Sequence, residues 1–150
     1  MSEKLFTEYL NLLTDLNEAV NSVNEVTLST PPSESEWSPA YILHHIADCE
    51  VQFQVRFSNT LAEERPTYRF FNEDVFPEAL HYEARSPRVS LELINTLTNM
   101  TVEMLQAVDS DAWNRKTIAE DGQEKSLKDL LEKVVDHRRA HLEQLKAAIA

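Results

Sequence analysis

The sequence predicts an all-α protein built as a four-helix bundle, and three observations carry this prediction. Glycine occurs once in 150 residues, at Gly122, which suits long helices and disfavours glycine-rich phosphate loops and sheets with several hairpins. Four separate stretches repeat apolar residues at three- and four-residue steps. Start signals for a helix precede three of these stretches. Residues 1–150 are therefore expected to form one domain with its own core.

The first two helices are expected over residues 3–26 and residues 39–62. The first carries a row of apolar residues on one face, and the Thr-Pro-Pro-Ser sequence at 30–33 then ends any helix and begins a loop. The second has the clearest start in the chain. Ser38 suits the N-cap position, and Pro39 suits the first helical position, where its missing N–H costs nothing.

Residues 65–86 have no helical period and are expected to form a long connection, with a short helix near residues 78–84. Long ordered connections in compact domains are often functional. Two interpretations stay open, because the aromatic residues gathered here can serve a binding site or simply cover one end of the bundle. These residues are Tyr68, Phe70, Phe71 and Phe76.

The third and fourth helices each follow a serine cap. Ser86 and Pro87 start the third helix, which is expected to end around Asp109. Ser126 starts the fourth helix, and Asp129 stands where an acidic side chain completes a capping box. The fourth helix places a row of leucine, valine and isoleucine residues on one face, so it is expected to pack against the other three.

The composition excludes several kinds of partner. The net charge of −12 and the pI of about 4.8 disfavour binding to nucleic acid or to an anionic membrane, and the only basic cluster is Arg138-Arg139. Cys49 is the only cysteine, so no internal disulfide forms, as is usual in a reducing cytosol. Neither a signal peptide nor an apolar run long enough to cross a bilayer is recognisable. We expect a soluble cytoplasmic protein.

Three histidines form the candidate functional site. His137 and His141 are four residues apart in the fourth predicted helix, so both imidazoles lie on one face, one turn apart. His45 lies on the apolar face of the second predicted helix. A single histidine on such a face is usually a core residue with one hydrogen bond. Three of them facing inward from two helices instead favour a shared divalent metal ion, since bundles build metal sites from facing helices.

Three neutral histidine ligands would leave a coordination position open, which is typical of catalytic metal sites. A ligand in that position is a water molecule, activated for hydrolysis, or a thiol, held as thiolate for transfer. We expect zinc or nickel, although nitrogen ligands also suit iron and manganese. Cys49, one turn after His45, is either a fourth ligand or a packed core residue.

Further candidates have weaker support. Asp48 follows His45 by three residues and suits either a general base, a partner for an imidazole, or a solvated carboxylate, and we favour the solvated carboxylate. Arg56 or Arg69 would bind an anionic group of a substrate, unless both are surface charges. His44 and His81 are assigned to surface or loop positions. No nucleophilic triad, phosphate loop or paired-carboxylate motif is recognisable.

Two segments resemble the DinB/YfiT-like superfamily. Residues 37–50, WSPAYILHHIADCE, are similar to a family motif in which a tryptophan precedes the second helix and a histidine lies in an H-L-A-D-x-E context. His45 takes that histidine position, with isoleucine in place of the leucine. Residues 127–144, with the pattern H-x-x-x-H-x-x-Q, are similar to the last helix of the family. The likeness spans nearly the whole chain.

The resemblance implies a bundle of up-down-down-up topology, a homodimer, and a divalent metal held by His45, His137 and His141. Family members include bacillithiol- or mycothiol-dependent transferases, maleylpyruvate isomerases and proteins proposed to be metal-dependent hydrolases. We therefore expect a metal-dependent enzyme that transfers a low-molecular-weight thiol to an electrophilic small molecule near residues 65–86. The alternatives are a metal-dependent hydrolase and a non-catalytic metal-binding bundle. No residue of this chain is matched to a catalytic residue of the family.

Overall fold

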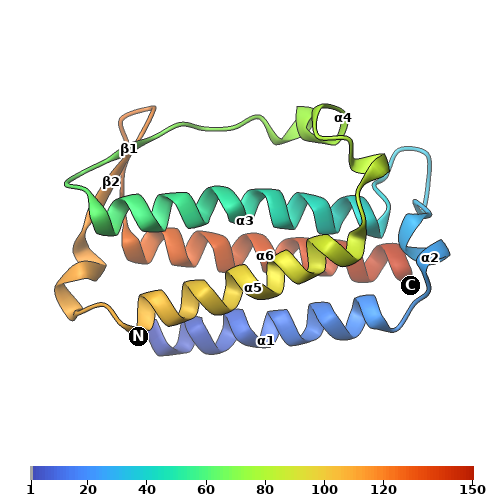
Figure 1. Ribbon diagram of the computed structural model, residues 1–150, viewed down its shortest axis with the longest axis horizontal. Coiled ribbons are helices and arrows are strands. Elements are labelled where there is room, and N and C mark those ends of the chain that lie inside the picture. The colour runs from blue at the N-terminus through green and yellow to red at the C-terminus, as the bar shows by residue number, and fades with distance from the viewer. Residues whose placement is uncertain (1) are drawn as a thin grey trace.

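The computed structural model describes residues 2–150 and confirms the all-α four-helix bundle. α1 and α6 run in one direction and α3 and α5 in the other, which is the expected up-down-down-up arrangement (Figure 1). Within residues 2–150, no helix combines the length and the apolar character needed to cross a membrane. The four long helices are α1 (Ser2–Asn21), α3 (Pro39–Ala62), α5 (Pro87–Gln106) and α6 (Leu127–Ile149).

Three of the four long helices begin where their serine caps predict. The Ser38 side chain accepts a backbone N–H of the first turn of α3, and Pro39 is the first helical residue. Ser86 caps α5 in the same manner. At the start of α6, the backbone N–H of Asp129 donates to Ser126 Oγ at 3.0 Å, and the backbone N–H of Ser126 donates to Asp129 Oδ2 at 2.8 Å. This reciprocal pair is the predicted capping box.

The first predicted helix is wrong in one respect, because the chain divides it into two. α1 ends at Asn21, and a short helix, α2 (Glu25–Ser29), follows. The side chain of Asn24 accepts the backbone N–H of Thr27 at 2.9 Å and so caps α2. An asparagine side chain competes with the helical backbone for hydrogen bonds, which accounts for the break inside an apolar period that otherwise continues.

A small sheet, absent from the prediction, covers the end of the bundle where α3 ends and α6 begins (Figure 1). It consists of β1 (Thr67–Tyr68), β2 (Lys116–Ala119) and β3 (Glu124–Ser126). β1 pairs parallel to β2, and β2 and β3 form a hairpin whose turn places Gly122 at φ 88°, a left-handed conformation that favours glycine. Strands of two to four residues are too short to show a period in the sequence.

Residues 63–86 run back along the length of α3, which is why α3 and α5 point in the same direction (Figure 1). The short helix expected near 78–84 is instead α4 (Phe76–Ala79), flanked by single 3₁₀ turns at Glu73–Val75 and Tyr82–Ala84. Tyr82 is only 1% exposed and anchors this connection on the bundle. The connection is thus an ordered wall along one side of α3.

The apolar core consists of two clusters, one at each end of the bundle. Each cluster receives buried side chains from α1, α3, α5 and α6, so it joins all four long helices. The cluster nearer α2 includes Leu16, Val20, Leu28, Ile42, Ile46, Ile94, Leu142 and Leu145. The cluster nearer the sheet includes Phe6, Tyr9, Phe53, Phe57, Leu105, Leu127, Leu131 and Val134.

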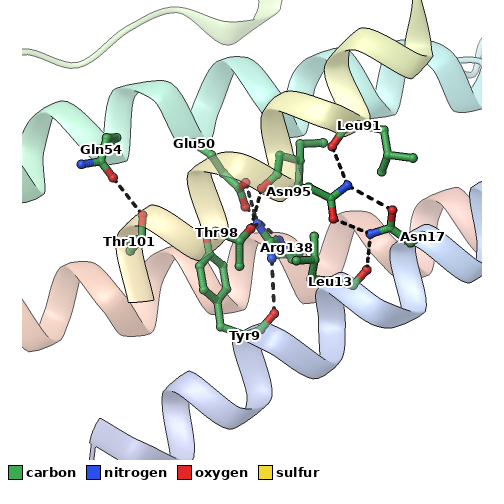
Figure 2. Close-up of polar contacts among 11 residues, drawn as sticks. Tyr9, Leu13, Asn17, Glu50, Gln54, Leu91, Asn95, Thr98, Thr101 and Arg138 are labelled. Atoms are coloured by element: carbon green, nitrogen blue, oxygen red, sulfur yellow. Dashed lines mark hydrogen bonds and ion pairs between the residues drawn. The ribbon is translucent and has the colours of Figure 1, made fainter. Parts of the chain in front are cut away.

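A buried polar layer separates the two apolar clusters (Figure 2). Arg138 donates to both carboxylate oxygens of Glu50, at 2.9 and 2.7 Å, and also to Thr98 Oγ1 at 2.6 Å and to the Tyr9 carbonyl at 3.3 Å. Its guanidinium lies 4.0 Å from the centre of the Tyr9 ring. Arg138 and Glu50 are 0% and 2% exposed, so Arg138 belongs to the core and not to a basic surface cluster.

Candidate metal centre

The three predicted histidines meet on the side of the bundle where α3 faces α6. His45 Nε2 lies 3.0 Å from His141 Nε2 and 3.2 Å from His137 Nε2. Nitrogen ligands held about 2.0–2.1 Å from a tetrahedral ion are roughly 3.3 Å from one another. Both distances from His45 Nε2 therefore fit pairs of ligands on one divalent ion.

The hydrogen bonds of the second ring nitrogen, Nδ1, are known for His141 and His137. His141 Nδ1 donates to Gln144 Oε1 at 2.8 Å, which places the ring proton on Nδ1 and leaves the Nε2 lone pair free. Within residues 2–150, the buried Nδ1 of His137 has no hydrogen-bond partner. The buried Nε2 of His44, outside this cluster, also lacks a partner there, so this feature alone does not mark the site.

Burial keeps the imidazoles of His45 and His137 neutral. It lowers the pKa of His45 to about 4, and the nearby His141 lowers it further. For His137, burial and the two neighbouring imidazoles lower the pKa to about 3. Both rings therefore remain unprotonated at neutral pH, which is the form that ligates a metal ion.

Two further ligand types lie beside the histidines. Cys49 Sγ is 3.7 Å from His45 Nδ1 and 3.7 Å from Glu73 Oε2. One ligand atom from each of His45, Cys49, Glu73 and His137 falls within 4.8 Å of the other three. Burial, reinforced by the Glu73 carboxylate, raises the pKa of Cys49, so the thiol stays protonated and donates to Glu73. Cys49 is thus a buried, protonated thiol next to the three histidines.

Glu73 is a site residue that sequence reasoning missed. It lies in the connection between α3 and α5, in a 3₁₀ turn that Asn72 caps. This segment has no period that would predict which way the side chain points. The asparagine cap marks the start of a turn and carries no information about the distance to His45.

Asp48 does not have the solvated position that we favoured. Its carboxylate accepts two hydrogen bonds from Arg85, at 2.7 and 2.8 Å, and one from the Tyr82 hydroxyl at 2.9 Å. Only 13% of the Asp48 side chain is exposed. With its lone pairs occupied, Asp48 is placed to hold the connection against α3 and not to act as a base. Arg85 lies 37 residues away in the chain, which is why the pairing could not be read from spacing.

The surface or loop assignment is wrong for His44 and confirmed for His81. His44 is 0% exposed, and its Nδ1 lies 2.7 Å from Ser90 Oγ. Burial lowers its pKa to about 4. The ring packs against Tyr82, since the connection covers the face of α3 to which His44 points. His81, by contrast, is exposed at a left-handed position between α4 and the following 3₁₀ turn.

A cavity of about 820 Å³ opens beside the histidines. Cys49 and His137 are among its lining residues, and the connection supplies much of its aromatic wall. Arg56 also lines the cavity, whereas Arg69 does not. Three of the four aromatic residues noted in the sequence of the connection therefore face a pocket of the size that holds small molecules, and Phe76 does not line it. The aromatic members of the lining are Phe53, Tyr68, Phe70 and Phe71.

Comparison with known proteins identifies a family and several relatives of this chain. The family model described as the DinB superfamily matches residues 9–145. The chain is similar to YfiT of Bacillus subtilis, a protein proposed to be a metal-dependent hydrolase, with 27% identity over 67% of this chain and 56% of that relative. It is similar at 27% identity to a Bacillus licheniformis protein with the same proposed activity, over 88% of this chain and 76% of that relative.

Solved structures share the fold. The structure of Bacillus subtilis YfiT, described as an unusual four-helix bundle, superposes with a TM-score of 0.83 at 24% identity, over 97% of this chain and 85% of that one. A mycothiol-dependent maleylpyruvate isomerase superposes with a TM-score of 0.76 at 13% identity, over 95% of this chain and 60% of that one. At these identities the likeness shows the fold and leaves chemistry to be argued from the residues.

Proposed function

The chain belongs to the DinB superfamily, and from that premise we propose that it is a divalent-metal-dependent enzyme. His45, His137 and His141 would hold the ion, with zinc or nickel as the metal. The observation that carries the proposal is the convergence of three imidazole rings beside a cavity that His137 lines. The relatives proposed to be metal-dependent hydrolases support the metal dependence.

We propose thiol transfer as the reaction, with a low-molecular-weight thiol and an electrophilic small molecule as the two substrates. When bound, the ion supplies Lewis acidity that lowers the pKa of a thiol or a water molecule. A cavity of about 820 Å³ has room for both substrates together. The isomerase that shares this fold is mycothiol-dependent, so the fold is compatible with thiol chemistry.

The residues around the cavity have distinct roles in this proposal. The Glu73 carboxylate, near His45, His137 and Cys49, is placed to accept the proton of the thiol. The thiol sulfur then forms a bond to the electrophilic carbon, and the leaving group departs with its bonding electrons and takes up a proton. Gln144 keeps the proton of His141 on Nδ1 throughout. The aromatic wall contacts the electrophile and excludes water.

Hydrolysis is the second candidate, favoured by the relatives and by the same carboxylate. Glu73 is equally placed to take a proton from a water molecule that attacks an ester or amide. In both reactions we propose a small molecule as partner and not nucleic acid or membrane, because the net charge is −12. The homodimer and the cytoplasmic location remain predictions of the sequence.

The test is a paired assay on protein loaded with zinc or nickel. N-acetylcysteine with 1-chloro-2,4-dinitrobenzene reports thiol transfer, and 4-nitrophenyl acetate without thiol reports hydrolysis. We expect turnover in one assay that His45→Ala abolishes and that His81→Ala, which changes an exposed histidine, leaves intact. Equal rates for wild type and His45→Ala in both assays would favour a non-catalytic bundle whose ion only joins α3 to α6.

A further inference from the structure

Arg56 lies on the same face of α3 as the candidate metal ligand. It follows His45 by eleven residues and Cys49 by seven, and both spacings return close to the same side of a helix. With a rise of about 1.5 Å per residue, Arg56 stands roughly 16 Å beyond His45 along the helix axis. Both Cys49 and Arg56 line the cavity, so α3 connects the histidine end to a cationic end.

Aromatic rings surround the Arg56 guanidinium. Its central carbon lies 4.2 Å from the centre of the Tyr68 ring, 5.3 Å from that of Phe53 and 5.5 Å from that of Phe71. Such contacts hold the planar group in one orientation and leave its edge free for hydrogen bonds. Tyr68 and Phe71 come from the connection, so the same segment that supplies Glu73 also orients Arg56.

The half-buried Arg56 guanidinium lacks a carboxylate partner within residues 2–150. Among residues 2–150, its hydrogen bonds amount to one long contact, from Nη2 to the Arg69 carbonyl at 3.4 Å. None of the ion pairs formed within that part of the chain includes Arg56. Arg85 and Arg138 show the contrast, because each binds a carboxylate with two hydrogen bonds. The chain has 26 acidic residues, so the missing partner is not explained by composition.

Partial burial makes this unpaired charge unfavourable. Partial removal from water lowers the pKa of Arg56 below its ordinary value, although a guanidinium stays charged at neutral pH. An anion bound in the cavity would replace the water that the Arg56 guanidinium has lost, because it accepts charge-assisted hydrogen bonds from this group. A planar carboxylate suits the edge of the guanidinium, because two parallel hydrogen bonds form at once.

The other charges of the cavity limit which anion fits. The lining contains more acidic than basic side chains, so a molecule with several negative charges would be repelled. The basic members are Arg56, Lys125 and Lys133, and the acidic members are Glu73, Asp74, Asp121, Asp129, Glu132 and Asp136. A single carboxylate on an otherwise apolar or aromatic body meets both the aromatic wall and the one unpaired guanidinium.

We propose that Arg56, framed by Tyr68 and Phe71, is a specificity-determining residue that binds the carboxylate of a monoanionic, aromatic or apolar substrate. The substrate then extends from the carboxylate at Arg56 toward the histidines, where its reactive carbon is presented. This inference rests on the proposed function for the location of the reaction. The binding of the carboxylate itself does not depend on the metal.

The test measures ligand binding to the metal-free protein, so that no ion competes for the carboxylate. Benzoate and its neutral counterpart benzamide are titrated into wild type and three variants, with calorimetry and the side-chain N–H signals of arginine as readouts. We expect wild type to bind benzoate at least about tenfold more tightly than benzamide. Arg56→Met removes that preference and leaves benzamide binding unchanged, whereas Arg56→Lys retains part of it.

Arg69→Met is the matched control, because Arg69 neighbours Arg56 through its backbone carbonyl but does not line the cavity. It is expected to bind both ligands as wild type does. Absence of saturable benzoate binding to wild type, or an undiminished preference for benzoate in Arg56→Met, would overturn the inference. Because these titrations contain no metal, a failure to bind metal in separate experiments would affect the proposed function and leave this result standing.

Discussion

His137 and Arg138 are neighbours in α6, yet they face two different kinds of polar environment. Arg138 points into the centre of the bundle, where Glu50, Thr98 and the Tyr9 carbonyl accept its hydrogen bonds (Figure 2). His137 points toward α3 on another side of the helix, with a buried Nδ1 that has no partner within residues 2–150. Its Nε2 lies 3.2 Å from another imidazole nitrogen.

The difference separates scaffold from function. In the polar layer, each charged group has a partner of opposite charge, so the layer fixes how α3 and α6 align. In the histidine cluster, ring nitrogens lie close together without partners of opposite charge within residues 2–150. This arrangement lowers the stability of the folded protein unless a ligand binds. The same two helices thus supply two networks. The closed network is the buried pair of Glu50 and Arg138, and the open network is the cluster of His45, His137 and His141. The closed network holds the open one in position.

Breaking the closed network should have the largest effect on stability. Arg138→Met leaves the Glu50 carboxylate buried without its partner, so we expect the free energy of unfolding to fall by about 3–5 kcal/mol. Urea unfolding of the metal-free protein measures the loss. The double variant Glu50→Leu/Arg138→Met should recover part of it, because no unpaired charge remains. A loss below about 1 kcal/mol for Arg138→Met would contradict the structural role assigned to this pair.

Acid should weaken the protein through the buried histidines. Burial holds the pKa of His44 and His45 at about 4 and that of His137 at about 3, against 6.5 for an ordinary histidine. Between about pH 6.5 and pH 4, the unfolded chain binds protons that the folded chain does not, so stability falls as the pH falls. Each histidine contributes up to about 1.4 kcal/mol per pH unit in this window and nothing above it.

Urea unfolding of the metal-free protein at pH 7, 6 and 5 measures this slope. His137→Ala should reduce the number of protons taken up on unfolding by about one. His81→Ala, at an exposed position, should leave it unchanged. A slope between pH 6 and pH 5 that His137→Ala does not alter would show that this ring titrates normally.

Gln144 offers a finer way to disturb the open network. Its Oε1 accepts the hydrogen bond from His141 Nδ1, so Gln144→Ala frees the ring to rotate and to change tautomer. We expect the affinity for zinc to fall by about tenfold, with little change in the stability of the metal-free protein. Competition with a chromophoric chelator gives the affinity. An unchanged affinity would mean that packing alone orients His141.

The smallest effect is expected at Arg139, next in the chain to Arg138. Arg139 pairs with Glu8 and Asp136 at the surface, where 44% of its side chain is exposed. Arg139→Met should therefore lower the free energy of unfolding by less than about 1 kcal/mol. Measured beside Arg138→Met, it shows whether burial or the loss of a positive charge causes the larger change. Equal losses in the two variants would point to charge.

Much of the fold could be predicted from the sequence, because the helix-capping residues and the apolar period indicate the same helices. Ser38-Pro39, Ser86-Pro87 and the box of Ser126 with Asp129 predict the observed starts of α3, α5 and α6. The break before α2 was not predicted, because the apolar period continues through it. The start of α2 depends instead on the capping hydrogen bond that the Asn24 side chain accepts. β1 joins the small sheet by pairing with β2, a segment about fifty residues further along the chain, and no local pattern contains this contact.

The residues of the candidate site likewise fall into those that the sequence predicted and those that it did not. Spacing within one helix predicted that His137 and His141 share a face, and the apolar face of α3 predicted that His45 points inward. Glu73, Arg85 and the burial of His44 all depend on how the connection folds back over α3, and this connection has no period. The three histidines on regular helices were therefore predicted, and the contacts made by the connection were missed.

The most direct test of the central claim is metal content. Wild type, His137→Ala and His81→Ala are each incubated with zinc, nickel or manganese, freed of unbound ions and analysed for elements. The account predicts about one divalent ion per chain in wild type and in His81→Ala, and none in His137→Ala. Wild type that retains none of the three metals would contradict it, and the three histidines would then be core residues of the bundle.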